Sequence, residues 1–154
     1  MRSKRLSTVE EQTYAVVLDA GDEVVESLTE WAADNGVRAA RLTGIGGFRQ
    51  VTLGFYDPDE LRYDPIPVHR QTEVLSLIGD FAMPDAMPDA MPDDDVRPHL
   101  HAHVVVGLPD GTTRGGHLLG GEVWPTLEVI VTQSPRYLKR RHDPATGLAL
   151  IDLD

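Results

Sequence analysis

The stretch from residue 98 to residue 121, PHLHAHVVVGLPDGTTRGGHLLGG, predicts two antiparallel strands joined by a tight turn. The Pro-Asp-Gly at 109–111 supplies the turn residues, and the valine run before it has the β-branched side chains that strands favour. Alternate residues of a strand point to the same face, so His99, His101 and His103 would line one side of the first strand. The flanking segments must show which sheet this hairpin joins and what the histidines do.

The segments on either side of the hairpin carry one helix pattern and further strand patterns. Residues 22–35, DEVVESLTEWAADN, predict the main helix, with Asp22 as its N-cap and Gly36 as the left-handed residue that ends it. Apolar runs bounded by turn residues predict strands within residues 13–22, 37–57, 72–83 and 126–134. The sequence therefore predicts an α+β fold with a mainly antiparallel β-sheet and one main helix.

Length and composition indicate a single domain. A chain of 154 residues can bury a sizeable core. We expect a flexible N-terminal segment over residues 1–11 and one domain over residues 12–154. Within it, the repeat AMPDAMPDAMPD and the two aspartates that follow predict a Pro/Asp-rich loop insertion at 82–95. Proline at every fourth position excludes both a regular helix and a central strand there.

Charge and residue types exclude several classes of protein. The 25 acidic residues outnumber the 14 basic ones, for a net charge of −11, whereas proteins that bind nucleic-acid backbones present basic surfaces. The absence of cysteine excludes disulfides, thiolate metal sites and cysteine nucleophiles. No apolar run is long enough for a membrane helix and no signal-peptide pattern follows the basic N-terminus, so we expect a cytoplasmic protein.

The glycine-rich segment TGIGGF, residues 43–48, invites a nucleotide-binding interpretation but lacks the required spacing. Arg49 occupies the third glycine position of a G-x-G-x-x-G motif, and the residues after it alternate like a strand. Since a phosphate site of this kind needs the N-terminus of a helix at that point, we expect a tight turn or a close approach of two backbones instead.

The histidines predict a metal site. Strand residues two apart lie roughly 6.6 Å from each other on one face, which lets two imidazoles converge on one ion. His117, on the far arm of the hairpin, supplies a third ligand. Three neutral imidazoles with an open fourth position are typical of catalytic zinc. The alternative is a sheet face that is simply lined by histidines. A cupin-type site would need a glutamate where Gly107 and Leu108 stand.

Glu128 is the candidate for a further role at this site. It belongs to the predicted strand at 126–134, from which its carboxylate would lie near the ion. There it would act as a hydrogen-bond partner of a ligand or as a general base. The catalytic residues are otherwise left open, as is the question of whether the protein is an enzyme.

The ordered motifs of this chain resemble the plants-and-prokaryotes conserved (PPC) domain, once catalogued as a domain of unknown function. They are TGIGGFRQVTLGFYD, EVLSLIGDFA, PHLHAHVVVG, RGGHLLGGEVWPTLEVIV and DPATGLALIDL, and the resemblance runs from about residue 12 to the C-terminus. It implies an antiparallel sheet with one main helix, assembled as a homotrimer. Aligned on the H-x-H and GGH motifs, it implies His101, His103 and His117 as ligands of Zn²⁺ or another divalent transition metal. His99 lies just outside this set, as an accessory residue.

Two functions are compatible with this resemblance. The first is a metal-binding domain whose open coordination position takes a small ligand or supports a metal-dependent reaction. The second is a regulatory domain that binds DNA or a protein, with a structural metal, because prokaryotic members are often named as DNA-binding proteins. In the plant proteins an AT-hook contacts DNA, and no such RGRP-like segment is present here. An ion that faces a cavity would favour the first function, and an enclosed ion the second.

Overall fold

The computed structural model describes residues 1–5, 12–84, 97–133 and 139–152. One helix and nine strands are found in these residues: β1 Arg2–Arg5, β2 Thr13–Asp19, α1 Val24–Asp34, β3 Ala40–Asp57, β4 Arg62–Val68, β5 Thr72–Pro84, β6 His99–Gly107, β7 Thr113–Gln133, β8 Lys139–Asp143 and β9 Leu148–Asp152. The prediction of an α+β fold with a mainly antiparallel sheet and one main helix is confirmed.

The sheet closes on itself through four strands. β3 pairs with β5 and β7, and β6 pairs with the same two strands, all antiparallel. β2 and β1 extend the sheet beyond β7, while β4 folds back on β3. β3 and β7 are long enough to pair with different neighbours at their two ends. Alternate residues of each strand therefore point into the ring or away from it.

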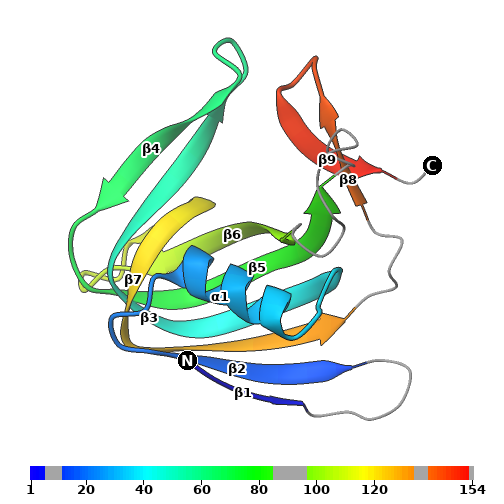
Figure 1. Cartoon of the computed structure of the whole chain (residues 1–154). Coiled ribbons are helices and arrows are strands. Elements are labelled where there is room, and N and C mark those ends of the chain that lie inside the picture. Colours follow the sequence, from blue (N-terminus) through cyan, green and yellow to red (C-terminus); the bar gives the residue numbers. More distant parts are fainter. Residues whose placement is uncertain (6–11, 85–96, 134–138, 153–154) are drawn as a thin grey trace.

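Two hairpins project from the same side of this sheet (Figure 1). One is formed by the end of β3 with β4, and the other by β8 with β9. β8 is joined to the sheet through parallel pairing with Met83 and Pro84 at the end of β5. The hydroxyl of Tyr56 in the first hairpin donates a hydrogen bond to the carbonyl of Thr146 in the second. The two hairpins are therefore tied to each other as well as to the sheet.

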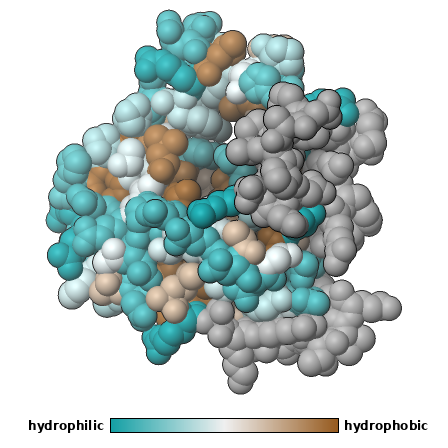
Figure 2. All heavy atoms as spheres, viewed as in Figure 1, coloured by the Kyte–Doolittle hydropathy of each residue, from teal (hydrophilic) through white to brown (hydrophobic). Residues whose placement is uncertain are grey.

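The core lies between α1 and the sheet, which the helix crosses (Figure 1). Val24, Leu28 and Trp31 of the helix are at most 2% exposed. Burying a large apolar side chain stabilises a fold by about 1.5–3 kcal/mol, so this one apolar face anchors the helix. The face of the molecule seen in Figure 2 is mostly hydrophilic, with a few hydrophobic patches.

The outward-facing residues of the strands include many large apolar side chains. Ile45 and Ile78 are 61% and 60% exposed, although both lie in central strands of the sheet. The larger set, at 39% exposure or more, also contains Phe55, Leu75, Val105, Leu119 and Ile130. The side of the sheet that α1 does not cover is therefore unusually apolar for a surface.

The N-terminus of α1 corrects the expected cap. The helix begins at Val24, and the carboxylate of Glu23 accepts hydrogen bonds from the backbone N–H of Glu26 and of Gly121, both at 2.8 Å. Asp22, the expected N-cap, instead accepts from the N–H of Asp19 at 2.9 Å. The longer Glu23 side chain reaches both the helix and β7, which explains the shift. The expected left-handed residue after the helix, Gly36, is found with a φ of 64°.

The glycines at 43–48 mark a close approach of backbones and do not form a turn. β3 runs through them with an irregular register between Gly44 and Gly46. A Cβ at Gly46 would lie 2.3 Å from the carbonyl oxygen of Thr126, and one at Gly47 equally close to that of Trp124. The segment is therefore a strand that only glycine allows to bend tightly against β7.

Three expectations concern segments at the limits of the described residues. Arg2–Arg5 form β1, paired with β2, within the segment expected to be flexible, and residues 6–11 lie outside the described residues. β5 continues to Pro84, so the first residues of the expected 82–95 insertion end a strand, a position that proline tolerates. The remainder of that insertion lies outside the described residues. No helix in the described part of the chain is both long and apolar enough to cross a membrane.

Candidate metal centre

The β6–β7 hairpin brings three histidines together. His103 and His117 are direct partners across the hairpin, and His101 lies two residues before His103 on the same face of β6. The three ring centroids are 5.2–5.3 Å apart, and one nitrogen from each ring lies within 4.8 Å of the others. The three rings thus form a nearly equilateral triangle.

This triangle fits a tetrahedral metal ion. With metal–nitrogen distances of about 2.0–2.1 Å, three tetrahedral imidazole ligands have ring centroids roughly 5.2 Å apart. The buried Nδ1 of His117 has no hydrogen-bond partner among the described residues. A buried polar atom without a partner is costly. The rings are therefore arranged so that they could hold a metal ion.

The surroundings of His117 keep its ring neutral. Burial, followed by the neighbouring histidines, lowers the pKa of His117 from 6.5 to about 4. The pKa of His103 is also lowered, by burial and then by the charge of His101. Tyr63 stacks on His117 with centroids 4.2 Å apart and an angle of 20° between the planes. A neutral and oriented imidazole is the form that binds a metal.

Asp80 and Arg140 complete the site, and the sequence did not predict either role. Arg140, only 6% exposed, contacts the Asp80 carboxylate through Nη2 at 2.7 and 2.9 Å and through Nε at 3.2 Å. Its Nη2 also lies 2.9 Å from Nδ1 of His101. Burial raises the pKa of Asp80, but His101 and the hydrogen-bonded guanidinium outweigh this effect and lower it.

The signal for Asp80 was present in the sequence but depended on the register of the sheet. Asp80 interrupts an apolar strand and pairs directly with His101 across β5 and β6. Once that register is known, a carboxylate beside a ligand histidine is expected. Arg140 lies in a separate hairpin, 60 residues from Asp80 in sequence, and no local pattern points to it. The contact between Arg140 and Asp80 therefore could not be predicted from the sequence.

A cavity of about 580 Å³ opens beside the triad. The two projecting hairpins form its walls, with Leu61 and Tyr63 on one side and Leu150 on the other. All three triad histidines line it, together with His99, Arg140 and His142. The site therefore faces a space large enough for a small molecule.

The other two residues singled out from the sequence lie differently. His99 lines the cavity but does not belong to the triad. Burial, then the charge of Arg140, lowers the pKa of His99. Glu128 is exposed and pairs with Val17 and Ile45, eleven residues beyond His117 on β7. In the sheet, β3 and β5 lie between the Glu128 segment of β7 and the histidines of β6, so Glu128 is not brought to the triad within this chain.

The chain is similar to a known family and to several solved structures. The family model of the Plants and Prokaryotes Conserved (PCC) domain matches residues 6–135. A plant- and prokaryote-conserved (PPC) protein of Pyrococcus horikoshii has a TM-score of 0.80 and 28% identity, covering 91% of this chain and 90% of that chain. A metal-containing protein of Archaeoglobus fulgidus has a TM-score of 0.78 and 30% identity, covering 98% of both chains.

Two further relatives carry other names. A "Putative DNA-binding protein" of Ralstonia eutropha has a TM-score of 0.79 and 32% identity, covering 92% of this chain and 91% of that chain. The "Bifunctional protein GlmU" of a Synechococcus strain is 28% identical over 149 residues, which are 95% of this chain and 21% of the relative. This chain therefore spans about a fifth of the length of the curated relative that it matches.

Proposed function

This chain belongs to the Plants and Prokaryotes Conserved domain family, and we propose that it is a zinc-binding member with His101, His103 and His117 as the ligands. The observation that carries the proposal is the triangle of three imidazoles with ligand nitrogens within 4.8 Å of one another. The name of the Archaeoglobus fulgidus relative, a metal-containing protein, supports it.

The donor atoms favour zinc or a similar transition metal. Imidazole nitrogens suit zinc, copper, iron and nickel, whereas magnesium and calcium prefer oxygen ligands. The triad contains three histidines and no carboxylate. The unpartnered Nδ1 of His117 and the lowered pKa of that ring both favour a bound cation over a proton.

The cavity beside the triad supports a role for a small ligand. Three protein ligands leave one tetrahedral position open, and here the triad lines a space of about 580 Å³. A zinc ion in such a site acts as a Lewis acid toward whatever occupies its open position. The residues of this chain orient the rings: Tyr63 stacks on His117, and the Asp80–Arg140 pair contacts His101. This geometry favours a ligand-binding site over a purely structural metal.

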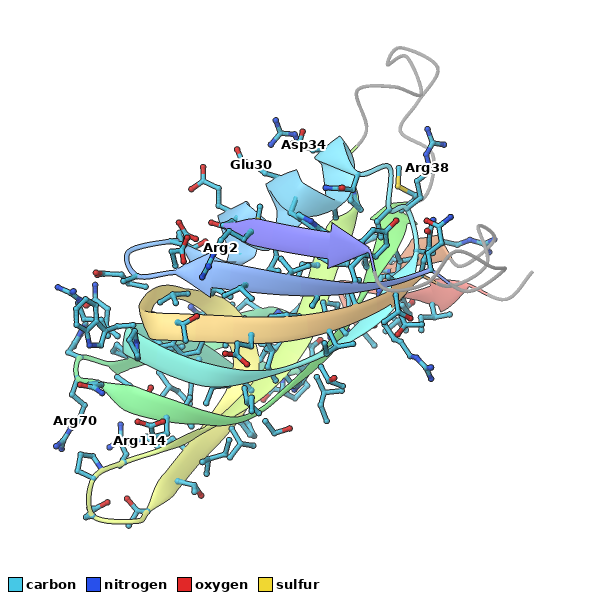
Figure 3. All side chains as sticks on the ribbon, turned by 90° about the horizontal axis from the view of Figure 1, so that it is seen from below. Arg2, Glu30, Asp34, Arg38, Arg70 and Arg114 are labelled. Carbon is cyan, nitrogen blue, oxygen red and sulfur yellow. The ribbon has the colours of Figure 1, made fainter. Side chains whose placement is uncertain are left out.

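The alternative function, a DNA-binding or protein-binding regulatory domain, is supported by the name of the Ralstonia eutropha relative. The charge of this chain argues against DNA, since the net charge is −11. Arg70 and Arg114 lie close together at one end of the molecule, apart from Arg2 and from Arg38, and Arg38 is close to the acidic end of α1 (Figure 3). In the basic cluster near the C-terminus, Arg140 is buried against Asp80. The net charge and the burial of Arg140 therefore favour the metal-site proposal over DNA binding.

The exposed face of the sheet supports assembly as a homotrimer. Ile78 and Ile130 flank Thr43 on neighbouring strands, and both are at least 45% exposed. Monomeric soluble proteins rarely expose a contiguous apolar patch of this kind. Further copies of this chain would cover the face in a closed symmetric assembly. The number three comes from the resemblance to the family.

Metal analysis tests the proposed function directly. Protein purified without chelator should contain about one zinc per chain, and chelator followed by dialysis should remove it. Because an ion that binds only the folded state stabilises it, added zinc should raise the melting temperature of the stripped protein. The triple variant with His101, His103 and His117 changed to alanine is the control and should show no such rise. Absence of metal together with no thermal shift in the wild type would refute the proposal.

A further inference from the structure

The second ring nitrogen of His101 lies between two charged side chains. Its Nδ1 is 2.9 Å from Nη2 of Arg140 and 3.7 Å from Oδ2 of Asp80. A guanidinium can only donate hydrogen bonds, so at 2.9 Å the Nδ1 atom must be the acceptor. The neutral ring then carries its proton on Nε2.

This arrangement places the proton on the nitrogen that an ion needs. A cation at Nδ1 would be repelled by the adjacent Arg140 guanidinium, which leaves Nε2 of His101 for the metal. A ligand nitrogen must be free of its proton before it can bind. The hydrogen bond from Arg140 therefore stabilises the form of His101 that cannot bind a metal through Nε2.

We propose that Asp80 and Arg140 are positioning residues that set the tautomer of His101. When Nε2 carries the proton, Nδ1 accepts from Arg140; a metal ion at Nε2 would leave the proton on Nδ1, from which it would be donated to Asp80. The change needs no net gain of protons, because Nε2 loses one to water while Nδ1 takes one up. The Asp80 oxygen is already close enough that a small movement of the ring would complete the new hydrogen bond.

The contacts of Arg140 allow this exchange without unfolding the site. Besides Nη2, its Nε contacts Asp80 at 3.2 Å and its Nη1 donates to the carbonyl of Ala149 at 2.8 Å. Arg140 therefore keeps Asp80 in place when its contact with His101 is lost. A carboxylate that accepts from a ligand histidine fixes the ring and strengthens its bond to the metal. Asp80 takes the role that the sequence had suggested for Glu128.

This inference rests on the proposed metal site, and nitrogen NMR of the wild type tests it without any variant. Histidine-labelled protein is measured at one fixed pH, without metal and with one equivalent of zinc. The expected result is that His101 carries its proton on Nε2 without zinc and on Nδ1 with zinc bound at Nε2. If zinc binds and His101 has the same tautomer in both states, the inference is wrong although the proposed function stands. If zinc does not bind, the proposed function itself fails.

Variants of Asp80 give a second and independent readout. Asp80→Asn should weaken zinc binding by about 10- to 100-fold, the range usual for the partner of a ligand histidine, as measured by competition with a chromophoric chelator. Asp64→Asn is the matched control: Asp64 is half exposed and pairs with Arg62 near the same cavity, so zinc binding should not change. Asp80→Glu keeps the carboxylate and should restore most of the affinity. An Asp80→Asn affinity within twofold of the wild type would overturn the inference, and the NMR result decides if this variant does not fold.

Discussion

Both faces of the sheet carry large hydrophobic side chains, but the two faces differ in what covers them. On the inner face α1 covers the strands, and residues such as Leu127 and Val129 are at most 1% exposed. On the outer face Ile45 and Ile78 are about 60% exposed, and no element of the described chain covers them. The exposed apolar side chains of this outer face are here called the apolar row. At one end of the face they give way to histidines, because Ile78 pairs directly with His103.

This difference separates what stabilises the fold from what the protein does. The inner face needs only this chain, because helix and sheet bury each other. The outer face presents apolar side chains for an additional partner and, at its end, a polar site. If this division is correct, changes at the histidines should affect metal binding but not assembly, and changes at the apolar row should do the reverse.

The largest effect is expected for the histidines. His117→Ala should lower zinc affinity by more than about 100-fold, because losing a ligand should exceed the 10- to 100-fold cost of losing a ligand's partner. His99→Ala is the matched control, since His99 lines the same cavity outside the triad, and it should change affinity by only a few-fold. Chelator competition measures both. Equal losses for the two variants would place His99 among the ligands and change the assignment of the site.

A charged substitution in the apolar row should prevent the chains from assembling into a trimer and should leave zinc binding unchanged. Ile45→Lys places a charge on a side chain that is 61% exposed, so the free subunit should tolerate it, whereas an interface that buries Ile45 should not. Light scattering should then show a single chain in place of a trimer, with unchanged zinc content. Ile151→Lys, a substitution at 45% exposure on β9, serves as the control and should remain trimeric. A wild type that is already monomeric would refute the proposed assembly.

The fold could be predicted largely because its signals are local. The Pro-Asp-Gly turn, the apolar face of the helix and the H-x-H alternation each fix structure within a few residues. They sufficed for the hairpin that joins His103 to His117. For the glycines at 43–48, a tight turn and a close backbone approach were both left open, because the approach of Gly46 to Thr126 depends on a strand distant in sequence.

The parts of the site that were missed depend on long-range register. Glu128 was placed near the ion because β7 was expected to be two separate strands; in the single strand of 21 residues, Glu128 pairs with β2 and β3 and not with β6. Asp80 was overlooked since only the β5–β6 register sets it beside His101. Arg140 reaches the site from a hairpin that pairs with the end of β5. A single sequence contains no local pattern for any of these three placements.

The pH at which zinc dissociates should reveal the burial of His117. Because the pKa of His117 in the metal-free fold is lowered to about 4, protons compete with zinc at lower pH than the 6.5 of a free imidazole. Zinc should therefore stay bound to lower pH than a site of three ordinary imidazoles would allow. Dialysis at each pH followed by elemental analysis measures this. Release centred near pH 6.5 would show that burial does not protect the ring.

The same lowered pKa predicts how the stability of the metal-free protein depends on pH. His117 is neutral in the folded state down to about pH 4, whereas in the unfolded chain it takes up a proton near pH 6.5. The folded state thus binds fewer protons between these values, so the free energy of unfolding should fall as the pH decreases from about 6.5 to 4. Denaturant unfolding of the stripped protein should show this slope, and His117→Ala should make it shallower.

The smallest effect is expected for binding to duplex DNA. Strong binding to duplex DNA uses roughly 6–10 phosphate contacts by lysine or arginine, and the net charge of −11 is multiplied in an oligomer. Of the cluster at 136–141, Arg140 is committed to Asp80. A gel-shift assay at about 150 mM salt should therefore show no retained complex, for the wild type and for a variant with Arg141→Gln alike. Submicromolar binding by the wild type that this substitution abolishes would instead support a regulatory domain, with DNA bound at the end of the molecule that carries the β8–β9 hairpin.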